Sequence, residues 1–360
     1  MKGSFRLNRL KKIRNIYQSV GADGVFIYSP ENRRYLSRFT GTTGYLVIGN
    51  EEAGFITDSR YTNQASEQCT GFEIIENKLN LADYLADTIN RYGIKKIAYE
   101  DSYMTIKFYN DLKEKLEGIE FIPLKDAEGQ IRIIKDQEEL ENIEKAAEIA
   151  DKAFTHILDF VKVGAKEKEL ALELEFFMRK NGATGLSFES ILASGWRSAL
   201  PHGAASDKRI EPNDFVVFDF GCVYNGYCSD MTRTVVVGKV SEKQKNIYNT
   251  VLKAQKEALR YIKPGALCKD IDKVARDIIK DAGYGEYFGH GLGHGVGLAI
   301  HEEPRLSPIG EVTLEENMVV TDEPGIYIPG FGGVRIEDLV AVGKDGPIIY
   351  SKTTKDLIEL

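Results

Sequence analysis

A carboxylate inside an apolar strand constrains this chain more than any other feature of its sequence. The segment FVVFDFG, residues 215–221, is apolar except for Asp219, and such a run is typical of a strand buried on both faces. A lone carboxylate there is destabilised by several kcal/mol unless it is paired or bound to a metal ion. We therefore expect the fold to bring a positive charge to Asp219.

The dipeptide Asn225-Gly226 follows this run and predicts a two-residue type I′ hairpin turn. Such a turn pairs Asp219 with Thr232 and places Asp230 on the same face of the sheet, because side chains alternate along a strand. The two carboxylates are then diagonal neighbours, within about 8 Å between Cα atoms. Since like charges this close repel, a divalent cation between them is the simple remedy.

An ion pair with a basic residue is the alternative to a metal ion. Arg233 is the nearest base, but its parity directs it to the other face of the strand, which weakens this alternative without removing it. The same register pairs Cys222 with Ser229 and directs Cys228 to the other face. A disulfide between Cys222 and Cys228 is therefore not expected.

A second segment, residues 317–342, repeats the pattern. An apolar strand leads into Glu323, a turn rich in proline and glycine follows, and a second strand carries Glu337. The two glutamates are symmetric about Gly330, so a hairpin centred there would set them face to face. The irregular loop leaves this register open.

Three histidines fall in one glycine-rich segment, residues 288–304, whose five glycines argue against a regular helix. These are His290, His294 and His301. An HExxH zinc motif is excluded because Arg305 stands where the second histidine would be needed. One histidine among four carboxylates is an oxygen-rich ligand set, which suits Mn²⁺, and less strongly Co²⁺ or Fe²⁺, better than structural zinc.

The two remaining histidines give weaker signals. His202 follows a proline in SALPHGAAS, and it gains interest only from the strength of the other motifs. His156 lies in an amphipathic stretch and has no partner at ligand spacing, so we expect a surface or half-buried helix residue rather than a ligand.

Length and hydrophobic periodicity predict two domains in these 360 residues. Alternating helices and strands predict an α/β domain over residues 1–125. Residues 126–360 are expected to open with a long helix and to continue with short apolar strands. The elements expected in the first domain are helices at 5–20 and 80–92, strands at 25–29 and 95–100, and a hairpin of 45–49 and 53–57.

Composition excludes several classes of protein. With 47 basic and 55 acidic residues, the net charge of −8 argues against binding to nucleic acid. No apolar run approaches the roughly 18 residues of a membrane span, and no apolar segment follows the basic N-terminus as in a signal peptide. The four cysteines form no CxxC pair, so we expect reduced thiols and a cytoplasmic protein.

Taken together, these residues resemble the creatinase/aminopeptidase P/prolidase family of metallopeptidases, and the resemblance covers the whole chain. The segments ENRRYLSRFTG (31–41), TDSRY (57–61) and IRIIKDQEELENIEKA (131–146) are typical of its N-terminal domain. The resemblance implies an α/β (α+β) fold, with a creatinase-type N-terminal domain followed by a catalytic domain of the pita-bread fold.

The resemblance also implies a centre of two divalent metal ions, Mn²⁺ in the first place and Co²⁺ or Zn²⁺ as alternatives. Asp219 would bind the first ion, Asp230 and Glu337 would bridge the two, and His294 and Glu323 would complete the second.

Further roles follow from the same resemblance. Glu323 would also act as the general base. His202, His290 and His301 would contact the substrate and stabilise the tetrahedral intermediate, and Tyr327 and Arg335 would lie in the substrate pocket.

The N-terminal domain, His202 and His290 favour the Xaa-Pro peptidases over the methionine aminopeptidases. Within that group we expect an Xaa-Pro aminopeptidase, with an Xaa-Pro dipeptidase (prolidase) as the alternative. Creatinase is disfavoured because it is free of metal and this chain keeps all five ligand positions. A non-catalytic binding protein is the remote alternative. The expected partners are a proline-containing peptide and a second copy of the chain, with no nucleic acid and no membrane.

Overall fold

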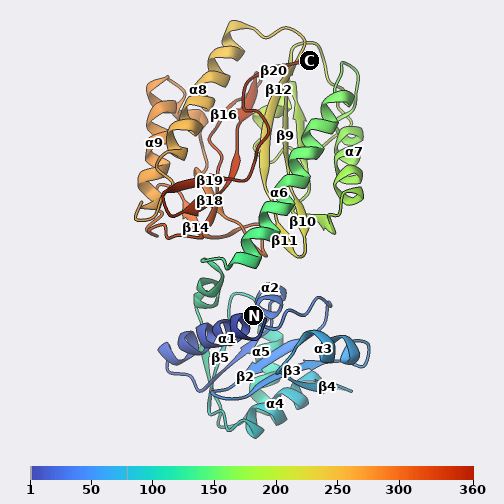
Figure 1. Ribbon diagram of the computed structural model, residues 1–360, viewed down its shortest axis with the longest axis vertical. Helices are drawn as coiled ribbons and strands as arrows, with labels where there is room; N and C mark the ends of the chain where they lie inside the picture. Colours follow the sequence, from blue (N-terminus) through green and yellow to red (C-terminus); the bar gives the residue numbers. More distant parts are fainter. Residues whose placement is uncertain (1, 79) are drawn as a thin grey trace. The chain divides into compact units, whose positions relative to one another are not determined.

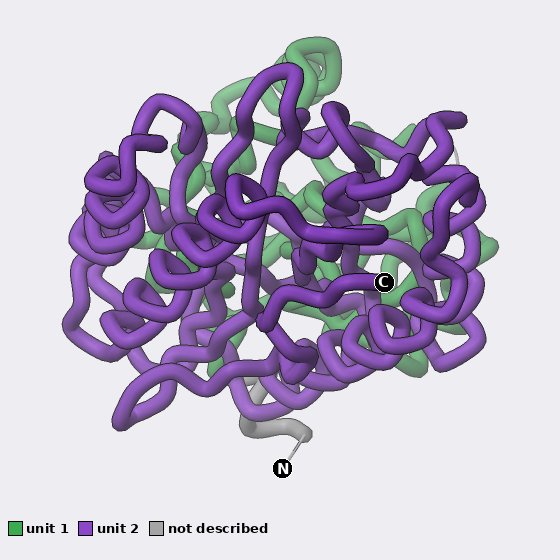
Figure 2. Tube along the Cα trace, turned by 90° about the horizontal axis from the view of Figure 1, so that it is seen from above, with its two compact units in different colours: residues 1–132 green, residues 133–360 purple. Residues whose placement is uncertain are grey.

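The computed structural model describes residues 2–78 and 80–360 and divides the chain into two compact units, residues 1–132 and 133–360 (Figure 2). This division lies after the expected one between residues 125 and 126. The chain stays with the first unit because residues 127–132 form a short 3-10 helix, and the Ile131 carbonyl accepts hydrogen bonds from Lys12 Nζ at 3.3 Å and Tyr35 Oη at 2.8 Å.

The first unit is built on a six-stranded sheet with strand order β4-β3-β2-β1-β5-β6. Strands β1, β2 and β3 pair antiparallel in succession, whereas the β1–β5, β5–β6 and β3–β4 pairs are parallel. The expected helices and strands are all present, with ends that differ by a few residues. The elements are α1 (Lys2–Ser19), β1 (Gly24–Ile27), α2 (Pro30–Ser37), β2 (Tyr45–Ile48), β3 (Ala53–Thr57), α3 (Thr62–Gln68), β4 (Glu73–Glu76), α4 (Leu81–Arg91), β5 (Lys96–Tyr99), α5 (Ile106–Lys115), β6 (Glu120–Pro123) and η1 (Ala127–Arg132).

The second unit contains three larger sheets, with strand orders β20-β12-β9-β8, β14-β13-β15-β18-β19 and β11-β10-β7, and the hairpin β16-β17. Its helices are α6 (Gln137–Ile157), η2 (Leu158–Phe160), α7 (Glu167–Lys180), η3 (Gly195–Ala199), α8 (Glu242–Leu259), α9 (Cys268–Asp281) and η4 (Gly285–Tyr287). Its strands are β7 (Gly185–Leu186), β8 (Ile191–Ser194), β9 (Asp214–Phe220), β10 (Cys222–Tyr224), β11 (Tyr227–Cys228), β12 (Met231–Val237), β13 (Gly293–Gly295), β14 (Glu302–Leu306), β15 (Val319–Asp322), β16 (Gly325–Ile328), β17 (Gly332–Arg335), β18 (Asp338–Gly343), β19 (Gly346–Ile349) and β20 (Ile358–Glu359).

Two pairs of helices flank the strands of the second unit, α6 with α7 on one side and α8 with α9 on the other (Figure 1). One apolar core joins α6 and α7 to β9 and β12, through residues such as Phe154, Leu174 and Phe218. The other joins α8 and α9 to β15, β17 and β18, through residues such as Val251 and Val340. The strands are therefore held between two helical layers.

Capping residues define where the first helix of each pair begins. Asp136 and Glu139 form a reciprocal capping box at the start of α6, and Ser241 and Gln244 form one at the start of α8. Each box satisfies backbone amides that a helix N-terminus otherwise leaves without a partner.

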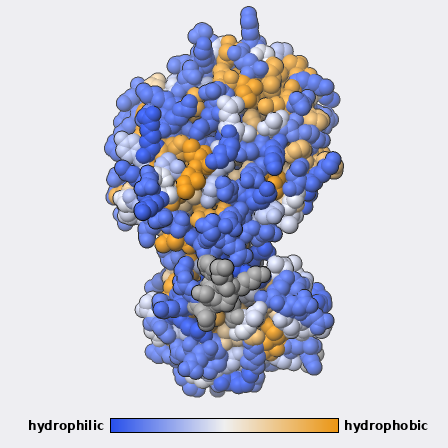
Figure 3. Space-filling view, in the orientation of Figure 1, coloured by the Kyte–Doolittle hydropathy of each residue, from blue (hydrophilic) through white to orange (hydrophobic). Residues whose placement is uncertain are grey.

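Hydrophilic residues predominate on the face of the molecule in Figure 3, and apolar ones form small separate groups. No helix within residues 2–78 and 80–360 is long and apolar enough to cross a lipid bilayer. Cys222 Sγ contacts Ala146 O at 3.4 Å and Cys228 Sγ contacts Leu298 O at 3.8 Å, and as expected the two cysteines form no disulfide with each other.

Candidate metal centre and active site

The first acidic hairpin has the register that its turn predicts. Asn225 and Gly226 have φ values of 46° and 84°, the left-handed conformation that a type I′ turn requires at both positions. Asp219 on β9 pairs with Thr232 on β12. This prediction is confirmed, because the turn sets the alignment of the whole hairpin.

The second acidic hairpin is symmetric about Gly330. Gly325 pairs with Arg335 across β16 and β17, and Asp322 pairs with Asp338 across β15 and β18. Both pairs belong to one register, and Glu323 and Glu337 occupy equivalent positions between them. The register that sequence symmetry suggested is therefore confirmed.

The two hairpins and strand β13 bring possible metal ligands together. One ligand atom from each of Asp230, His294 and Glu337 lies within 4.8 Å of the other two. His294 Nε2 lies 3.5 Å from Asp230 Oδ2 and 3.3 Å from Glu323 Oε1. Asp219 reaches the same cavity from β9. All five expected ligand residues therefore converge.

Within residues 2–78 and 80–360, several oxygens of this cluster have no hydrogen-bond partner. They are the buried atoms Asp219 Oδ1, Asp230 Oδ1 and Glu337 Oε1. Buried polar atoms almost always have partners, and a carboxylate oxygen can accept a cation as well as a proton. Oxygens free to ligate, beside an imidazole nitrogen, are the donor set that hard divalent ions such as Mn²⁺ prefer. The residues present therefore fit a metal centre.

The pKa values of these side chains also fit a metal centre. Burial, followed by the repulsion of neighbouring carboxylates, raises the pKa of Asp230 and of Glu337 well above the usual values. Burial raises the pKa of Glu323 to about 7. Burial lowers the pKa of His294 to about 3, so this imidazole is neutral near pH 7, the form that ligates metals. Without a cation, the acidic side chains favour the protonated state.

Arg335 supplies one positive charge to the cluster. Its Nη2 donates to Asp219 Oδ2, its Nε to Thr232 Oγ1 at 3.1 Å, and its Nη1 to Tyr327 Oη at 2.7 Å. The ion-pair alternative considered for Asp219 is thus present, with Arg335 as the base. Arg233 points to the other face of β12, as its parity predicted.

The remaining histidines divide into three environments. His290 Nε2 lies 2.9 Å from Tyr327 Oη, and burial lowers the pKa of His290 to about 4. The His301 ring packs against His294 with centroids 4.3 Å apart, while His202 lines the cavity. His156 is half-buried on α6 with Nε2 2.7 Å from Glu173 Oε1, and it does not line the cavity.

A cavity of about 770 Å³ contains this cluster. Every residue expected in the site lines it except Tyr327, which lies behind His290 and Arg335. Sequence reasoning did not identify Phe188, Glu189 and Arg305, which also line the cavity. Arg305 stands at an exposed position of β14, and the sequence EEPRL of this strand has no apolar alternation that would have marked it.

Comparison with known proteins identifies the class of this site. Residues 141–344 match the model of metallopeptidase family M24, and residues 9–134 match the creatinase/prolidase N-terminal domain. The Xaa-Pro dipeptidase of Pyrococcus horikoshii is 44% identical over 351 residues, which cover 97% of this chain and 98% of that protein.

Solved structures with the same fold include the Xaa-Pro dipeptidase from Bacillus anthracis, with a TM-score of 0.97, 47% identity, and coverage of 99% of this chain and 100% of that one. The X-Pro aminopeptidase from Thermotoga maritima has a TM-score of 0.89 and 40% identity, with coverage of 96% and 100%.

The two acidic hairpins and His294 form a group of possible metal ligands between the helical layers, which fits a metal-dependent hydrolase. The chain belongs to metallopeptidase family M24: it is a metallo-exopeptidase whose pita-bread catalytic domain follows a creatinase-type N-terminal domain.

Proposed function

We propose that this protein is a metal-dependent Xaa-Pro dipeptidase, a prolidase. The convergence of Asp230, His294 and Glu337 within 4.8 Å, beside Asp219 and Glu323, carries the proposal of a metal centre. The relatives of 44–47% identity that are described as Xaa-Pro dipeptidases favour the dipeptidase over the aminopeptidase, which was our first expectation.

Two divalent ions would be held by the five side chains in the roles that the resemblance implies. These side chains are those of Asp219, Asp230, His294, Glu323 and Glu337. When bound, the ions supply Lewis-acid polarisation of the scissile carbonyl and lower the pKa of water. The identity of the metal stays a prediction, with Mn²⁺ first, as does the homodimer.

The chain's own groups would move the proton and stabilise charge. Glu323, which lines the cavity, would accept the proton of the attacking water and hand it to the proline nitrogen as the C–N bond breaks. His202 and His301, which line the cavity, would donate hydrogen bonds to the developing oxyanion. One such donor is typically worth about 10²- to 10³-fold in rate. His290 would act with Tyr327 at the wall of the substrate pocket.

Arg305 gives a physical reason for a preference for dipeptides. A dipeptide carries a carboxylate on its proline, whereas a longer peptide has an amide there. Two arginines line the cavity, and Arg335 is already engaged with Asp219, Thr232 and Tyr327. Arg305 is exposed and forms no ion pair with the part of the chain that the structure describes, so it is available for the substrate carboxylate.

The proposal is tested by measuring cleavage of an Xaa-Pro dipeptide and an Xaa-Pro-Xaa tripeptide. The protein is stripped with a chelator and assayed with Mn²⁺, Co²⁺ or Zn²⁺ added back. We expect metal-dependent cleavage of the dipeptide and little of the tripeptide. Efficient cleavage of the tripeptide at its Xaa-Pro bond would instead establish the aminopeptidase. If neither peptide were cleaved with metal bound, the proposal of an Xaa-Pro peptidase would be wrong.

A further inference from the structure

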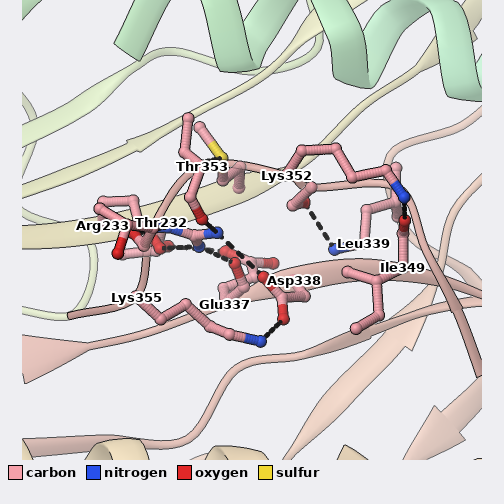
Figure 4. A network of polar contacts seen from close by, with 12 residues as sticks. Thr232, Arg233, Glu337, Asp338, Leu339, Ile349, Lys352, Thr353 and Lys355 are labelled. Atoms are coloured by element: carbon pink, nitrogen blue, oxygen red, sulfur yellow. Dashed lines mark hydrogen bonds and ion pairs between the residues drawn. The ribbon is translucent and has the colours of Figure 1, made fainter. Parts of the chain in front are cut away.

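A buried network of charges joins Arg233 on β12 to Asp338 and Lys355 (Figure 4). Its centre is Arg233, which is only 1% exposed, and its acidic partner is Asp338, which is fully buried. Arg233 Nη2 donates to Asp338 Oδ1 at 3.0 Å. Neither residue lines the cavity, so neither can touch a substrate there.

All five N–H donors of the Arg233 guanidinium are used, and they join three separate parts of the chain. Besides Asp338, the acceptors are carbonyl oxygens of Thr232 on β12, of Glu337 just before β18, and of Thr353 and Thr354. The last two belong to the C-terminal strap, as we name residues 351–355.

The C-terminal strap contributes a second charge to the network. Lys355 Nζ donates to Asp338 Oδ2, and Gln255 Nε2 donates to the same oxygen at 2.9 Å. Asp151 on α6 holds the strap through the amides of Lys352 and Thr353, at 2.7 and 3.0 Å. The strap is thereby tied both to the helical layer and to Asp338.

The network forms hydrogen bonds with the backbone of the expected ligand Glu337. The Glu337 amide donates to Thr232 O at 3.1 Å, and its carbonyl accepts from Arg233 Nη1. On the cavity side, Thr232 Oγ1 donates to Glu337 Oε2 at 2.6 Å. The position of the Glu337 carboxylate therefore depends on groups that lie on both faces of β12.

Stability alone is a weak reason to bury such a network. Transfer of an arginine, a lysine and a carboxylate from water costs several kcal/mol per ion, and well-packed apolar residues often replace buried ion pairs without loss of stability. A network of fully bonded charged groups does, however, define a single geometry. Groups that orient metal ligands from behind typically change metal affinity or activity by about 10- to 100-fold.

We propose that Arg233 is a positioning residue for the metal centre, which joins β12, Asp338 and the C-terminal strap so that the Glu337 carboxylate is held beside Asp230 and His294. The inference rests on the metal centre of the proposed function. It adds that the C-terminal strap, which contributes no proposed ligand, sets the affinity of that centre.

The test compares the parent protein with the variants Arg233→Lys, Asp338→Asn and Lys355→Met. The dissociation constant of Mn²⁺ is measured by calorimetry on chelator-stripped protein, and the rise in Tm on adding Mn²⁺ is recorded. We expect Arg233→Lys to weaken Mn²⁺ binding by about 10- to 100-fold. Lys355→Met, at the more exposed edge of the network, should have a smaller effect of the same sign. Excess Mn²⁺ should restore most of the kcat of each variant.

Lys352→Met is the matched control, because Lys352 lies in the same strap and its exposed Nζ donates to the Ile349 carbonyl rather than to Asp338. It should bind Mn²⁺ like the parent. If the network serves stability alone, Arg233→Lys and Lys355→Met will lower the Tm of the stripped protein but leave the Mn²⁺ dissociation constant unchanged. That result would overturn the inference. If Arg233→Lys does not fold, Lys355→Met decides between the same two outcomes. If the parent protein binds none of Mn²⁺, Co²⁺ or Zn²⁺, the proposed metal centre itself is wrong.

Discussion

Thr232 and Glu337 come from different hairpins and are joined side chain to side chain, with Thr232 Oγ1 donating to Glu337 Oε2 at 2.6 Å. The same hydroxyl accepts a hydrogen bond from Arg335 Nε at 3.1 Å. Glu337 Oε1 receives no hydrogen bond from the residues that the structure describes. The threonine thus occupies one oxygen of the carboxylate and leaves the other for a metal ion.

Replacing Thr232 by valine should therefore weaken the metal centre. The variant keeps the shape of the side chain but leaves Glu337 Oε2 buried without its donor, which costs about 1–3 kcal/mol. We expect Mn²⁺ affinity to fall by roughly tenfold or more, as for other groups that orient a ligand. The Mn²⁺ affinity is measured by calorimetric titration of the chelator-stripped protein. Thr232→Ser keeps the hydroxyl and should bind nearly as the parent does. Equal losses in both variants would assign the effect to packing instead.

The metal-free protein should lose stability as the pH rises above about 6.5. Burial raises the pKa values of Asp230 and Glu337 well above normal and that of Glu323 to about 7. At a pH between the pKa of such a group in the unfolded chain and its pKa in the folded protein, the folded protein therefore binds more protons than the unfolded chain. The free energy of unfolding therefore falls with rising pH in that window, by at most about 1.4 kcal/mol per pH unit for each proton. Below about pH 6.5 the effect is opposed, because burial depresses the pKa values of His290 and His294, and the unfolded histidines then bind protons.

Urea unfolding at pH 6.5, 7.25 and 8 with chelator present measures this slope. Glu323→Gln removes one titrating group and should flatten it, and saturating Mn²⁺ should abolish it by neutralising the cluster. A free energy of unfolding that rises with pH over this range would contradict the assignment of these side chains as protonated in the metal-free protein.

The parts of the site that local sequence rules govern could be predicted, and the parts that depend on packing between hairpins could not. The Asn225-Gly226 turn determined the register of Asp219 against Thr232, because a two-residue loop allows one alignment. The contact of Arg335 with Asp219 joins strands 116 positions apart in the chain, and no period or turn predicts it. The two carboxylate pairs followed from the strand pattern and the turns, whereas the choice of His294 among three histidines and the role of each ligand came from the resemblance.

Arg305→Ala should impair dipeptide binding selectively. A charge-assisted hydrogen bond to the proline carboxylate is worth about 1.5–3 kcal/mol, so KM for an Xaa-Pro dipeptide should rise by roughly 10- to 150-fold. KM for the same dipeptide as its C-terminal amide should change little, since the carboxylate is absent. Arg260→Ala, which removes an exposed arginine paired with Glu257 on α8, is the control. A comparable rise in KM for both substrates would mean that Arg305 does not recognise the carboxylate.

Glu167 illustrates why other supporting residues escape sequence reasoning. Nothing in the charged sequence around it distinguishes a buried acid from a solvated one, yet Glu167 is fully buried at the start of α7. Its Oε1 accepts from the Ser194 amide and hydroxyl at 2.7 and 2.9 Å, and its Oε2 from those of Ser206 at 3.0 and 2.6 Å. These two serines lie at the two ends of the loop that carries His202. The Glu167 carboxylate therefore binds both ends of that loop.

Glu167→Gln should therefore reduce turnover without affecting metal affinity. The amide keeps the shape but replaces one acceptor oxygen with a donor that faces the Ser194 or Ser206 amide, which loosens the loop and displaces His202. A displacement of about 1 Å can lower the rate by about 10²-fold, so we expect kcat to fall between about 10- and 100-fold. Because no proposed metal ligand lies on this loop, the Mn²⁺ dissociation constant should stay that of the parent. Asp207→Asn, an exposed acid paired with Lys168 just beyond the loop, should leave both quantities unchanged. A loss of metal affinity in parallel with kcat would show that Glu167 supports the whole centre rather than the His202 loop.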